Sequence, residues 1–378
     1  MSTADWRKLG DVYYRKTQVY EMCWSSKIDP AQYTLVGAPL AGPLALVKDA
    51  RFRYKPGGRE ERAIIYTFSS SGLPISSVAW DRRIVGMGWS NKDQLVVVVD
   101  SGDVKILNVR CDIDFSCSLG EVFALETASD CFVWPGGVVA RTGGSYVFHV
   151  LTNFDSPRIE ALPSLGISKP PRCFCAANVQ VDYRTTATRV VVSTGEGPLL
   201  VLQEGKWNEC VLNIGAVEKM ALSHDGRALA AFTDRSELAI GSMESLKGFR
   251  VLDKLEVLPL DMMWCGEEAI LVFISNSLRL YNISGACIEY NYDGYEEGLR
   301  LVPDPDGVRI FTAETCEFLH KVPKSTESIF SIGSVEPAAT LHDATEAFET
   351  KNAKADEIMR SISSASSLSA AIYSCVRC

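Results

Sequence analysis

The sequence predicts a mainly β protein: a seven-bladed β-propeller followed by a short α-helical segment that starts an α-solenoid. Three observations indicate this. Apolar runs recur at the period of propeller blades, the turns between them suit hairpins, and the apolar spacing becomes helical near residue 334. The expected domains are a propeller over residues 1–333 and a truncated helical segment over residues 334–378.

Each repeat unit is a short apolar run that ends in a polar or glycine-containing turn and resumes as a second run. The turns begin at Asp49, Asp100, Thr142, Thr194, Asp234, Ser275 and Thr312. Successive turns are separated by 51, 42, 52, 40, 41 and 37 residues. Propeller blades repeat at roughly 40–50 residues, whereas leucine-rich repeats need roughly 20–29. Seven turns therefore predict seven blades.

The runs read as strands joined by hairpins. Leu95–Val99 shows no polar alternation, which is typical of a strand covered on both faces by neighbouring blades. Asn91–Asp93 and His224–Gly226 supply residues that tolerate a left-handed backbone or cap their own backbone. Strand, turn and strand therefore follow one another within each unit.

Tryptophans occur at equivalent places in different units. Trp89, Trp134 and Trp264 each stand near the end of the strand before the apolar run. Aromatic side chains repeated in this way pack between blades more often than they form a ligand cage. We expect all three to be buried.

After Pro337 the apolar residues recur at three- and four-residue steps, the spacing of a helix face. They are Ala338, Leu341, Ala344, Phe348, Ala355, Ile358, Met359 and Ile362. Pro337 suits the first helical turn and Ser334 is the expected cap. Ser363–Ser369 predicts a turn, and a second helix is expected from Leu368.

Composition excludes several classes of protein. Apolar residues make up 47% and charged residues 22% of the chain, which is typical of a folded protein. A net charge of −9 argues against a nucleic-acid binder, because phosphate binding needs concentrated Lys and Arg. Met1–Gly10 lacks a secretory apolar segment and no apolar run approaches the roughly 20 residues of a membrane span. We expect a cytoplasmic protein whose twelve cysteines are free thiols.

Motifs for nucleotide binding and nucleophilic catalysis are missing from the sequence. No G-x-x-x-x-G-K-[ST] loop and no G-x-S-x-G elbow occurs. Gly195–Gly197 lacks the third glycine of a dinucleotide fingerprint and reads as a hairpin turn. No catalytic and no cofactor-binding residues are expected.

A metal site is not expected either. The four histidines have no H-x-x-x-H or H-E-x-x-H pair; they are His149, His224, His320 and His342. Cys375 and Cys378 form a C-x-x-C, but a structural zinc needs four ligands and no second pair is in reach. Cys173 and Cys175 alternate as strand residues do, which predicts two core thiols on one sheet face.

One basic segment, Lys48–Arg62, is a candidate contact for an acidic partner or anionic lipid headgroups. It holds six basic and three acidic residues around Gly57 and Gly58. A solvated loop with no function is the alternative interpretation. The candidate contact residues are Lys48, Arg51, Arg53, Lys55, Arg59 and Arg62.

An ordered series of segments resembles the family of vacuolar protein sorting-associated protein 16. The segments are Tyr13–Lys16, Val19–Trp24, Gly37–Asp49, Gly86–Ser90, Met262–Gly266, Asp306–Ala339 and Ala353–Glu357. The similarity is strongest over Asp306–Ala339 and weakest between about 105 and 215. It covers nearly the whole chain, and no single motif carries it.

The resemblance implies a non-catalytic core subunit of two endolysosomal tethering complexes, the homotypic fusion and protein sorting complex and the class C core vacuole/endosome tethering complex. Implied partners are the other class C vacuolar protein sorting subunits, and the implied place is the cytoplasmic surface of late endosomes, lysosomes or vacuoles. The family's solenoid binds a Sec1/Munc18-type subunit. Residues 1–378 end where that solenoid begins, so this contact is not expected here.

Two other functions compete with this one. A stand-alone propeller that binds a peptide or lipid would need a basic or aromatic rim, and only Lys48–Arg62 indicates one. An enzyme with its site in the central channel would need histidines and carboxylates that converge from several blades, and the four histidines are dispersed.

Overall fold

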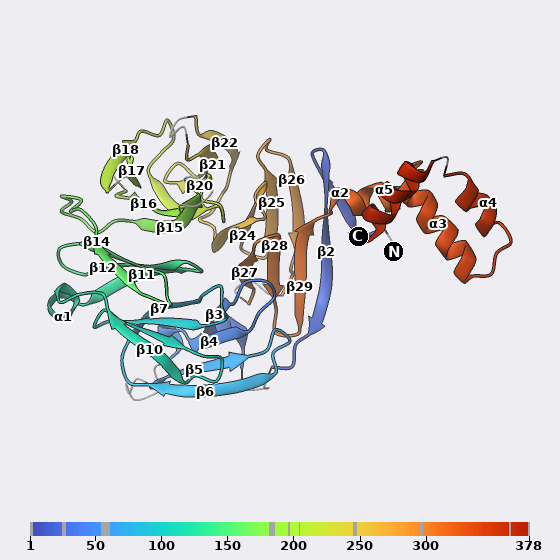
Figure 1. Ribbon diagram of the computed structural model, residues 1–378. Helices are drawn as coiled ribbons and strands as arrows, with labels where there is room; N and C mark the ends of the chain where they lie inside the picture. Colours follow the sequence, from blue (N-terminus) through green and yellow to red (C-terminus); the bar gives the residue numbers. More distant parts are fainter. Residues whose placement is uncertain are drawn as a thin grey trace. The chain divides into compact units, whose positions relative to one another are not determined.

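The computed structural model describes residues 3–24, 28–53, 61–180, 186–195, 197–203, 205–244, 248–294, 298–362 and 364–376. Over these residues the chain forms seven antiparallel sheets, the blades of a β-propeller, and a few helices after residue 320 (Figure 1). The predicted fold class is confirmed.

The strands follow one another through the blades in sequence order. Blade 1 contains β3 (Tyr33–Gly37), β4 (Leu44–Lys48), β5 (Ala63–Phe68) and β6 (Pro74–Trp80). Blade 2 contains β7 (Ile84–Trp89), β8 (Leu95–Val99), β9 (Asp103–Leu107) and β10 (Ile113–Ser118). Blade 3 contains β11 (Ala128–Trp134), β12 (Gly137–Thr142), β13 (Phe148–Thr152) and β14 (Arg158–Ala161). Blade 4 contains β15 (Cys173–Gln180), β16 (Thr186–Ser193), β17 (Leu199–Gln203) and β18 (Lys206–Cys210).

Blade 5 contains β19 (Val217–Leu222), β20 (Ala228–Thr233), β21 (Glu237–Ser242) and β22 (Arg250–Lys254). Blade 6 contains β23 (Asp261–Cys265), β24 (Ala269–Ile274), β25 (Ser277–Asn282) and β26 (Cys287–Asn291). Blade 7 contains β27 (Arg300–Asp304), β28 (Gly307–Phe311) and β29 (Thr315–Lys321), beside which lie β2 (Val12–Glu21) and β1 (Trp6–Leu9). Short helices interrupt the loops: η1 (Pro30–Gln32), η2 (Ala50–Phe52) and α1 (Val122–Glu126).

The first strands of consecutive blades contact one another around a closed ring, from β3 through β27 and back to β3. The seventh blade takes its fourth strand from the other end of the chain. The Met22 amide donates to the Glu314 carbonyl at 2.7 Å, beside the paired strands β2 and β29. Completing a blade in this way pairs the outer edge of β29 with β2 and so joins the two ends of the ring.

All seven turns predicted from the sequence lie between the second and third strands of a blade. The turn at Asp100 separates β8 from β9, and the turn at Ser275 separates β24 from β25. The least regular unit, at Asp49, differs because η2 and a long connection follow it before β5. Gly195 and Gly197 stand between β16 and β17, as the hairpin prediction requires.

The core of the propeller lies between blades. In β8, Leu95, Val97 and Val99 pack toward blade 1, while Val96 and Val98 pack toward blade 3. All five side chains are buried. The missing polar alternation in this strand therefore has the predicted cause: both faces of the blade are covered. Phe174 and its neighbours Cys173 and Cys175 likewise point to opposite blade interfaces.

By internal contacts the chain divides into two compact units. The propeller unit is Gln18–Leu319, and the terminal unit combines Met1–Thr17 with His320–Cys378. In the terminal unit β1 and the start of β2 form a hairpin, and the Val322 amide donates to the Tyr13 carbonyl at 2.8 Å. The expected boundary between a propeller and a helical segment at residue 334 stays a prediction.

The helices of the terminal unit are α2 (Lys324–Phe330), α3 (Pro337–Glu349), α4 (Ala355–Arg360) and α5 (Ala365–Val376). Helices α2, α3 and α5 share a small core in which Ile329, Ala338 and Ala371 are buried. Pro337 occupies the first turn of α3, as predicted.

Two details of the helix prediction are wrong. Ser334 does not cap α3, because its hydroxyl donates to the Ser328 carbonyl and Glu336 holds the cap position. The serine-rich segment is not a turn up to residue 369, since α5 begins at Ala365. The Ser364 hydroxyl accepts the Ser367 amide at 3.0 Å, so a serine starts the helix where a turn was expected.

Candidate functional site

The basic segment Lys48–Arg62 connects β4 to β5 in blade 1, and the structure describes four of its six candidate residues. Lys55 and Arg59 lie outside the described residues. Lys48 pairs with Glu61 at 3.5 Å and Arg51 with Asp49 at 3.1 Å. Two of the segment's own acidic residues therefore partly balance these cations.

The other two cations differ in exposure. Arg62 pairs with Asp81 at 3.2 Å, and its side chain is 74% exposed. Arg53 is buried and so cannot face a partner in this arrangement. Among the described cations of the segment, Arg51 and Arg62 are the most exposed, and their guanidinium groups are open to a ligand. The sequence alone could not separate them from Arg53, because burial depends on the loop conformation.

Histidines do not converge in the propeller. His149 packs edge-on against Phe123 with its Nδ1 at 2.6 Å from the Leu119 carbonyl, and His224 stands in the loop between β19 and β20. Among the described residues, one group of three potential metal ligands occurs: His342, Asp343 and Glu346, with ligand atoms within 4.8 Å of one another.

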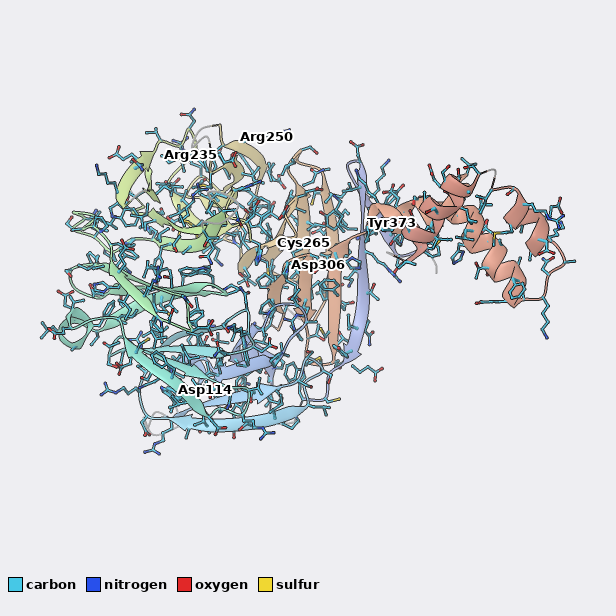
Figure 2. The ribbon with its side chains drawn as sticks, in the orientation of Figure 1. Asp114, Arg235, Arg250, Cys265, Asp306 and Tyr373 are labelled. Carbon is cyan, nitrogen blue, oxygen red and sulfur yellow. The ribbon has the colours of Figure 1, made fainter. Side chains whose placement is uncertain are left out.

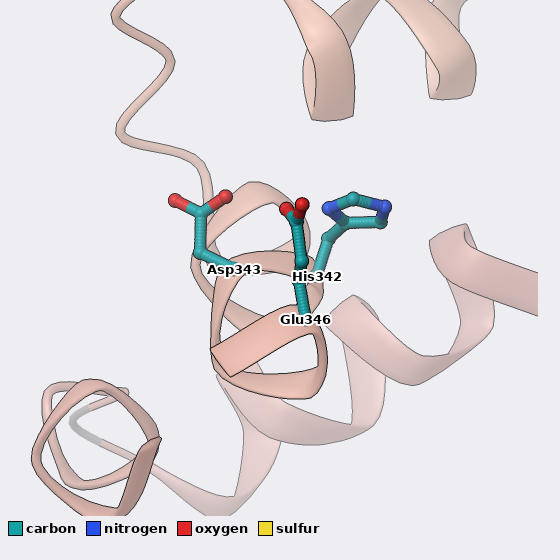
Figure 3. A group of neighbouring side chains, drawn as sticks. All are labelled: His342, Asp343 and Glu346. Atoms are coloured by element: carbon teal, nitrogen blue, oxygen red, sulfur yellow. The ribbon is translucent and has the colours of Figure 1, made fainter. Parts of the chain in front are cut away.

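Figure 3 shows these three side chains on α3. Asp343 and Glu346 are exposed, and the His342 ring packs edge-on against Phe330 at 4.9 Å between ring centres. Side chains three and four positions apart meet on any helix surface. Their proximity is therefore explained without an ion.

The tryptophans are buried at blade interfaces, as predicted. Trp89, Trp134 and Trp264 are 3%, 7% and 4% exposed. The indole N–H of Trp89 donates to Val36 O in the preceding blade, and that of Trp264 donates to Ala221 O in the preceding blade. Trp134 donates instead to the Asn178 side chain of the following blade at 3.1 Å.

Two arginines of blade 7 bind the backbone of the first segment of blade 1. Arg300 Nε donates to Tyr33 O at 2.8 Å. Arg309 Nη1 donates to Gly42 O at 3.1 Å and its Nη2 to Ala38 O. Its Nε lies 2.7 Å from a carboxylate oxygen of Asp304, in a pair with both side chains buried. The N–H direction is poor for a hydrogen bond, so the contact is mainly electrostatic.

A cavity of about 740 Å³ runs along the central channel of the propeller unit. First strands of blades 3 to 7 and the loops that follow them supply its wall. Its lining includes Trp134, Met220, Asp261, Met263 and Glu267. The volume falls within the roughly 300–1,000 Å³ of small-ligand sites.

Sequence reasoning missed both the arginine contacts and the channel carboxylates. A signal for the first was present, because Arg309 interrupts the otherwise apolar Val308–Phe311. A charge inside a central strand must find a partner when it is buried. No comparable signal marks Asp261 and Glu267, because the channel that the first strand of blade 6 lines exists only in the closed ring.

These features define a seven-bladed β-propeller protein. Among the described residues, no helix is long and apolar enough to cross a membrane. The family model described as Vps16, N-terminal region, matches residues 2–378, so the chain belongs to the Vps16 N-terminal family.

The relatives agree with this assignment. Protein VACUOLELESS1 of Arabidopsis thaliana is 30% identical over 400 residues, which cover 99% of this chain and 46% of the relative. A vacuolar protein sorting-associated protein 16 homolog of Dictyostelium discoideum is 30% identical over 374 residues, 96% of this chain and 44% of the relative. The chain thus spans about half the length of these curated relatives.

A solved structure supports the fold alone. A BBS1N chain, crystallised in complex with ARL6DN, superposes with a TM-score of 0.55 at 11% identity. The match covers 80% of this chain and 96% of that one.

Proposed function

We propose that this chain is a non-catalytic scaffold subunit of a membrane-tethering complex that acts in endosome-to-lysosome or vacuole transport and in vesicle fusion. The observation that supports this most strongly is the family match over residues 2–378, together with relatives named for vacuolar protein sorting. The proposed complexes are the homotypic fusion and protein sorting complex and the class C core vacuole/endosome tethering complex. The proposed partners are other class C vacuolar protein sorting subunits.

The geometry is consistent with a scaffold. The polar groups that converge at the seam between blades 7 and 1 bind backbone carbonyls, so they hold the ring together instead of activating a substrate. The proposed location is the cytoplasmic surface of late endosomes, lysosomes or vacuoles, reached through partner subunits.

Imaging tests this proposal. Residues 1–378 carrying a fluorescent tag should coincide with a late-endosome marker in cells, and depletion of another class C subunit should release the signal into the cytoplasm. A signal that is diffuse from the start, or that stays on the membranes after depletion, would contradict the proposal.

We also propose that the exposed part of the basic segment contributes a contact for anionic headgroups or an acidic partner. Arg51 and Arg62 have side chains that are 71% and 74% exposed. Each well-placed basic residue contributes about 1 kcal/mol near an anionic surface. Their effect is reduced here by Asp49 and Asp81.

Vesicle sedimentation with phosphatidylserine tests the lipid contact. The double variant Arg51→Glu with Arg62→Glu should bind about tenfold more weakly. The matched control reverses two exposed arginines of blade 5, Arg235 and Arg250, which are labelled in Figure 2. Equal weakening by both double variants would show that only net charge matters, and would refute a contact at the basic segment.

A further inference from the structure

The channel cavity opens among the inner loops, which we define as the connections between the first and second strands of each blade. Consecutive first strands lie side by side around the ring, so the described inner loops, those of blades 1 to 3 and 5 to 7, share one face of the propeller unit. The cavity lining extends along blade 6 from Asp261, at the start of β23, to Glu267 in the inner loop. The cavity therefore has both a deep end and a rim.

Two carboxylates in the cavity, those of Asp261 and Glu267, form no close ion pair with a described residue. Within the described part of the chain, no Lys or Arg nitrogen lies within 4.0 Å of the carboxylate oxygens of Asp261 or Glu267. Asp261 accepts one hydrogen bond, from the Met262 amide at 2.8 Å. The nearby Lys219 ammonium instead donates to the carbonyls of Pro259 and Leu260.

Burial has a measurable consequence for Asp261. Removal from water raises the pKa of its carboxyl group, and the charges of Lys219 and Arg300 and the Met262 amide offset this only in part. A cation bound beside Asp261 would oppose this shift, because an opposite charge favours the ionised form of a carboxyl group.

Other cavity carboxylates already have partners. Asp304 is paired with Arg309. Asp225 lies 3.9 Å from Arg227, which Glu244 also approaches at 3.7 Å. The unbalanced negative charge is thus concentrated at blade 6.

The rim around blade 6 is also acidic. Asp306, exposed in the inner loop of blade 7, lies close enough to the buried Cys265 to raise the pKa of its thiol together with burial. Figure 2 shows both labelled residues in neighbouring blades. In the inner loop of blade 2, Lys92 is paired with Asp155 at 2.7 Å. Described acidic side chains therefore outnumber free cations at the rim.

The walls between rim and deep end carry apolar side chains among polar ones. Met220 and Met263 are half-buried along the first strands, and Pro303 and Pro305 follow on blade 7. Methionine adapts to irregular contacts. Long cationic side chains bury their methylene stems on apolar surface while the charged end meets a polar partner. Apolar side chains along the walls, with carboxylates at both ends, therefore match the stems and charged ends of arginine and lysine.

We propose that the channel binds an extended segment of a partner protein that carries arginine or lysine side chains, one beside Glu267 at the rim and one toward Asp261 at the other end of β23. A volume of about 740 Å³ admits several residues and not only one side chain. The acidic rim favours further basic residues in the same segment.

A synthetic library of seven-residue peptides tests this on the purified chain 1–378. Each position is fixed in turn as Arg, Lys, citrulline, Glu or Leu. Arg and Lys should give the strongest binding, and citrulline, which keeps the shape of arginine without its charge, should weaken it about tenfold. Binding should fall as salt rises.

Variants locate the site. Glu267→Gln and Asp261→Asn should each weaken binding of the best basic peptide about tenfold. The matched controls are Glu209→Gln and Asp114→Asn on outer strands, of which Asp114 is labelled in Figure 2; neither should change binding. Because Glu267 is exposed, Glu267→Gln tests the site even if Asp261→Asn fails to fold. Four results would overturn the proposal. In the library these are equal binding of citrulline and arginine peptides, a preference for Glu, or no binding of any peptide. Among the variants it is full binding of the basic peptide by Glu267→Gln.

Discussion

A single buried side chain can join two neighbouring blades both by apolar packing and by a hydrogen bond. Trp264 packs with Ile270 and Val272 of its own blade and Phe232 of blade 5, and its N–H donates to Ala221 O at 2.9 Å. A buried donor that loses its partner, or a cavity left by a ring, each costs stability. The position of Trp264 was predictable because it repeats in the units. The direction of its hydrogen bond was not, since Trp134 at an equivalent place turns to the other side.

Replacing Trp264 with alanine should cost roughly 3–5 kcal/mol of unfolding free energy, as expected for a buried aromatic side chain. Urea unfolding followed by circular dichroism measures it. Phe348→Ala, at a position 74% exposed, is the control and should change the free energy by less than about 0.5 kcal/mol. Equal stability of both variants would contradict the packing role.

Thiol reactivity separates surface from core cysteines. Burial raises the pKa of Cys173 and of Cys316 to about 12, and the attacking species in alkylation is the thiolate. At pH 8 both should therefore stay unmodified by iodoacetamide while the exposed Cys23 reacts. Mass spectrometry of the digested protein reads this out, and addition of urea should make all three reactive. Rapid alkylation of Cys173 in the folded protein would contradict its burial.

Among the elements, strands were more predictable than helices. Strand positions follow from apolar runs and turn residues that are local in sequence, and each strand is held by two blades. The helices after residue 320 are short and share little core, so local capping decides where they begin. Serine favours both turns and helix starts, so the serine-rich pattern predicts a turn where Ser364 in fact starts a helix.

Closure of the ring is an element-scale property that no local pattern reveals. It joins segments about 270 residues apart, through Arg309 to Ala38 and Gly42. The channel site has the same origin, because the cavity that Asp261 and Glu267 line is enclosed only when the blades form a ring. A burial pattern cannot show which surface charges remain without a partner.

Arg309→Met should destabilise the protein by roughly 3–5 kcal/mol, since it leaves the Asp304 carboxylate buried without its cation. Burial already raises the pKa of Asp304, and loss of Arg309 should raise it further. The folded state would then bind the proton more tightly than the unfolded state. Stability of the variant should therefore fall as pH rises from about 4 toward 7.

Urea unfolding at pH 5 and pH 7 measures both effects. Arg279→Met breaks a more exposed pair with Glu289 and serves as the control, with an expected cost below about 1 kcal/mol at either pH. A variant of Arg309 that is as stable as this control, or that gains stability as pH rises, would contradict the role assigned to the buried pair.

At the scale of the whole molecule, the propeller unit has a central channel that a ligand can enter. Its buried pair of Arg309 and Asp304 stabilises the closed ring of blades. The terminal unit exposes apolar side chains on its helices, including Phe348 and Ile372. The closed ring of seven blades defines the class of protein, and the match over residues 2–378 defines the family. Which partners the propeller holds has to be measured, because the chain spans about half the length of its curated relatives.

Affinity purification of tagged residues 1–378 from cells, with quantitative mass spectrometry, tests the central claim most directly. We predict enrichment of other class C vacuolar protein sorting subunits and no enrichment of the Sec1/Munc18-type subunit, compared with a tagged unrelated propeller. Recovery of no class C subunit would contradict the scaffold role. Stoichiometric recovery of the Sec1/Munc18-type subunit would show instead that its binding surface lies within these residues.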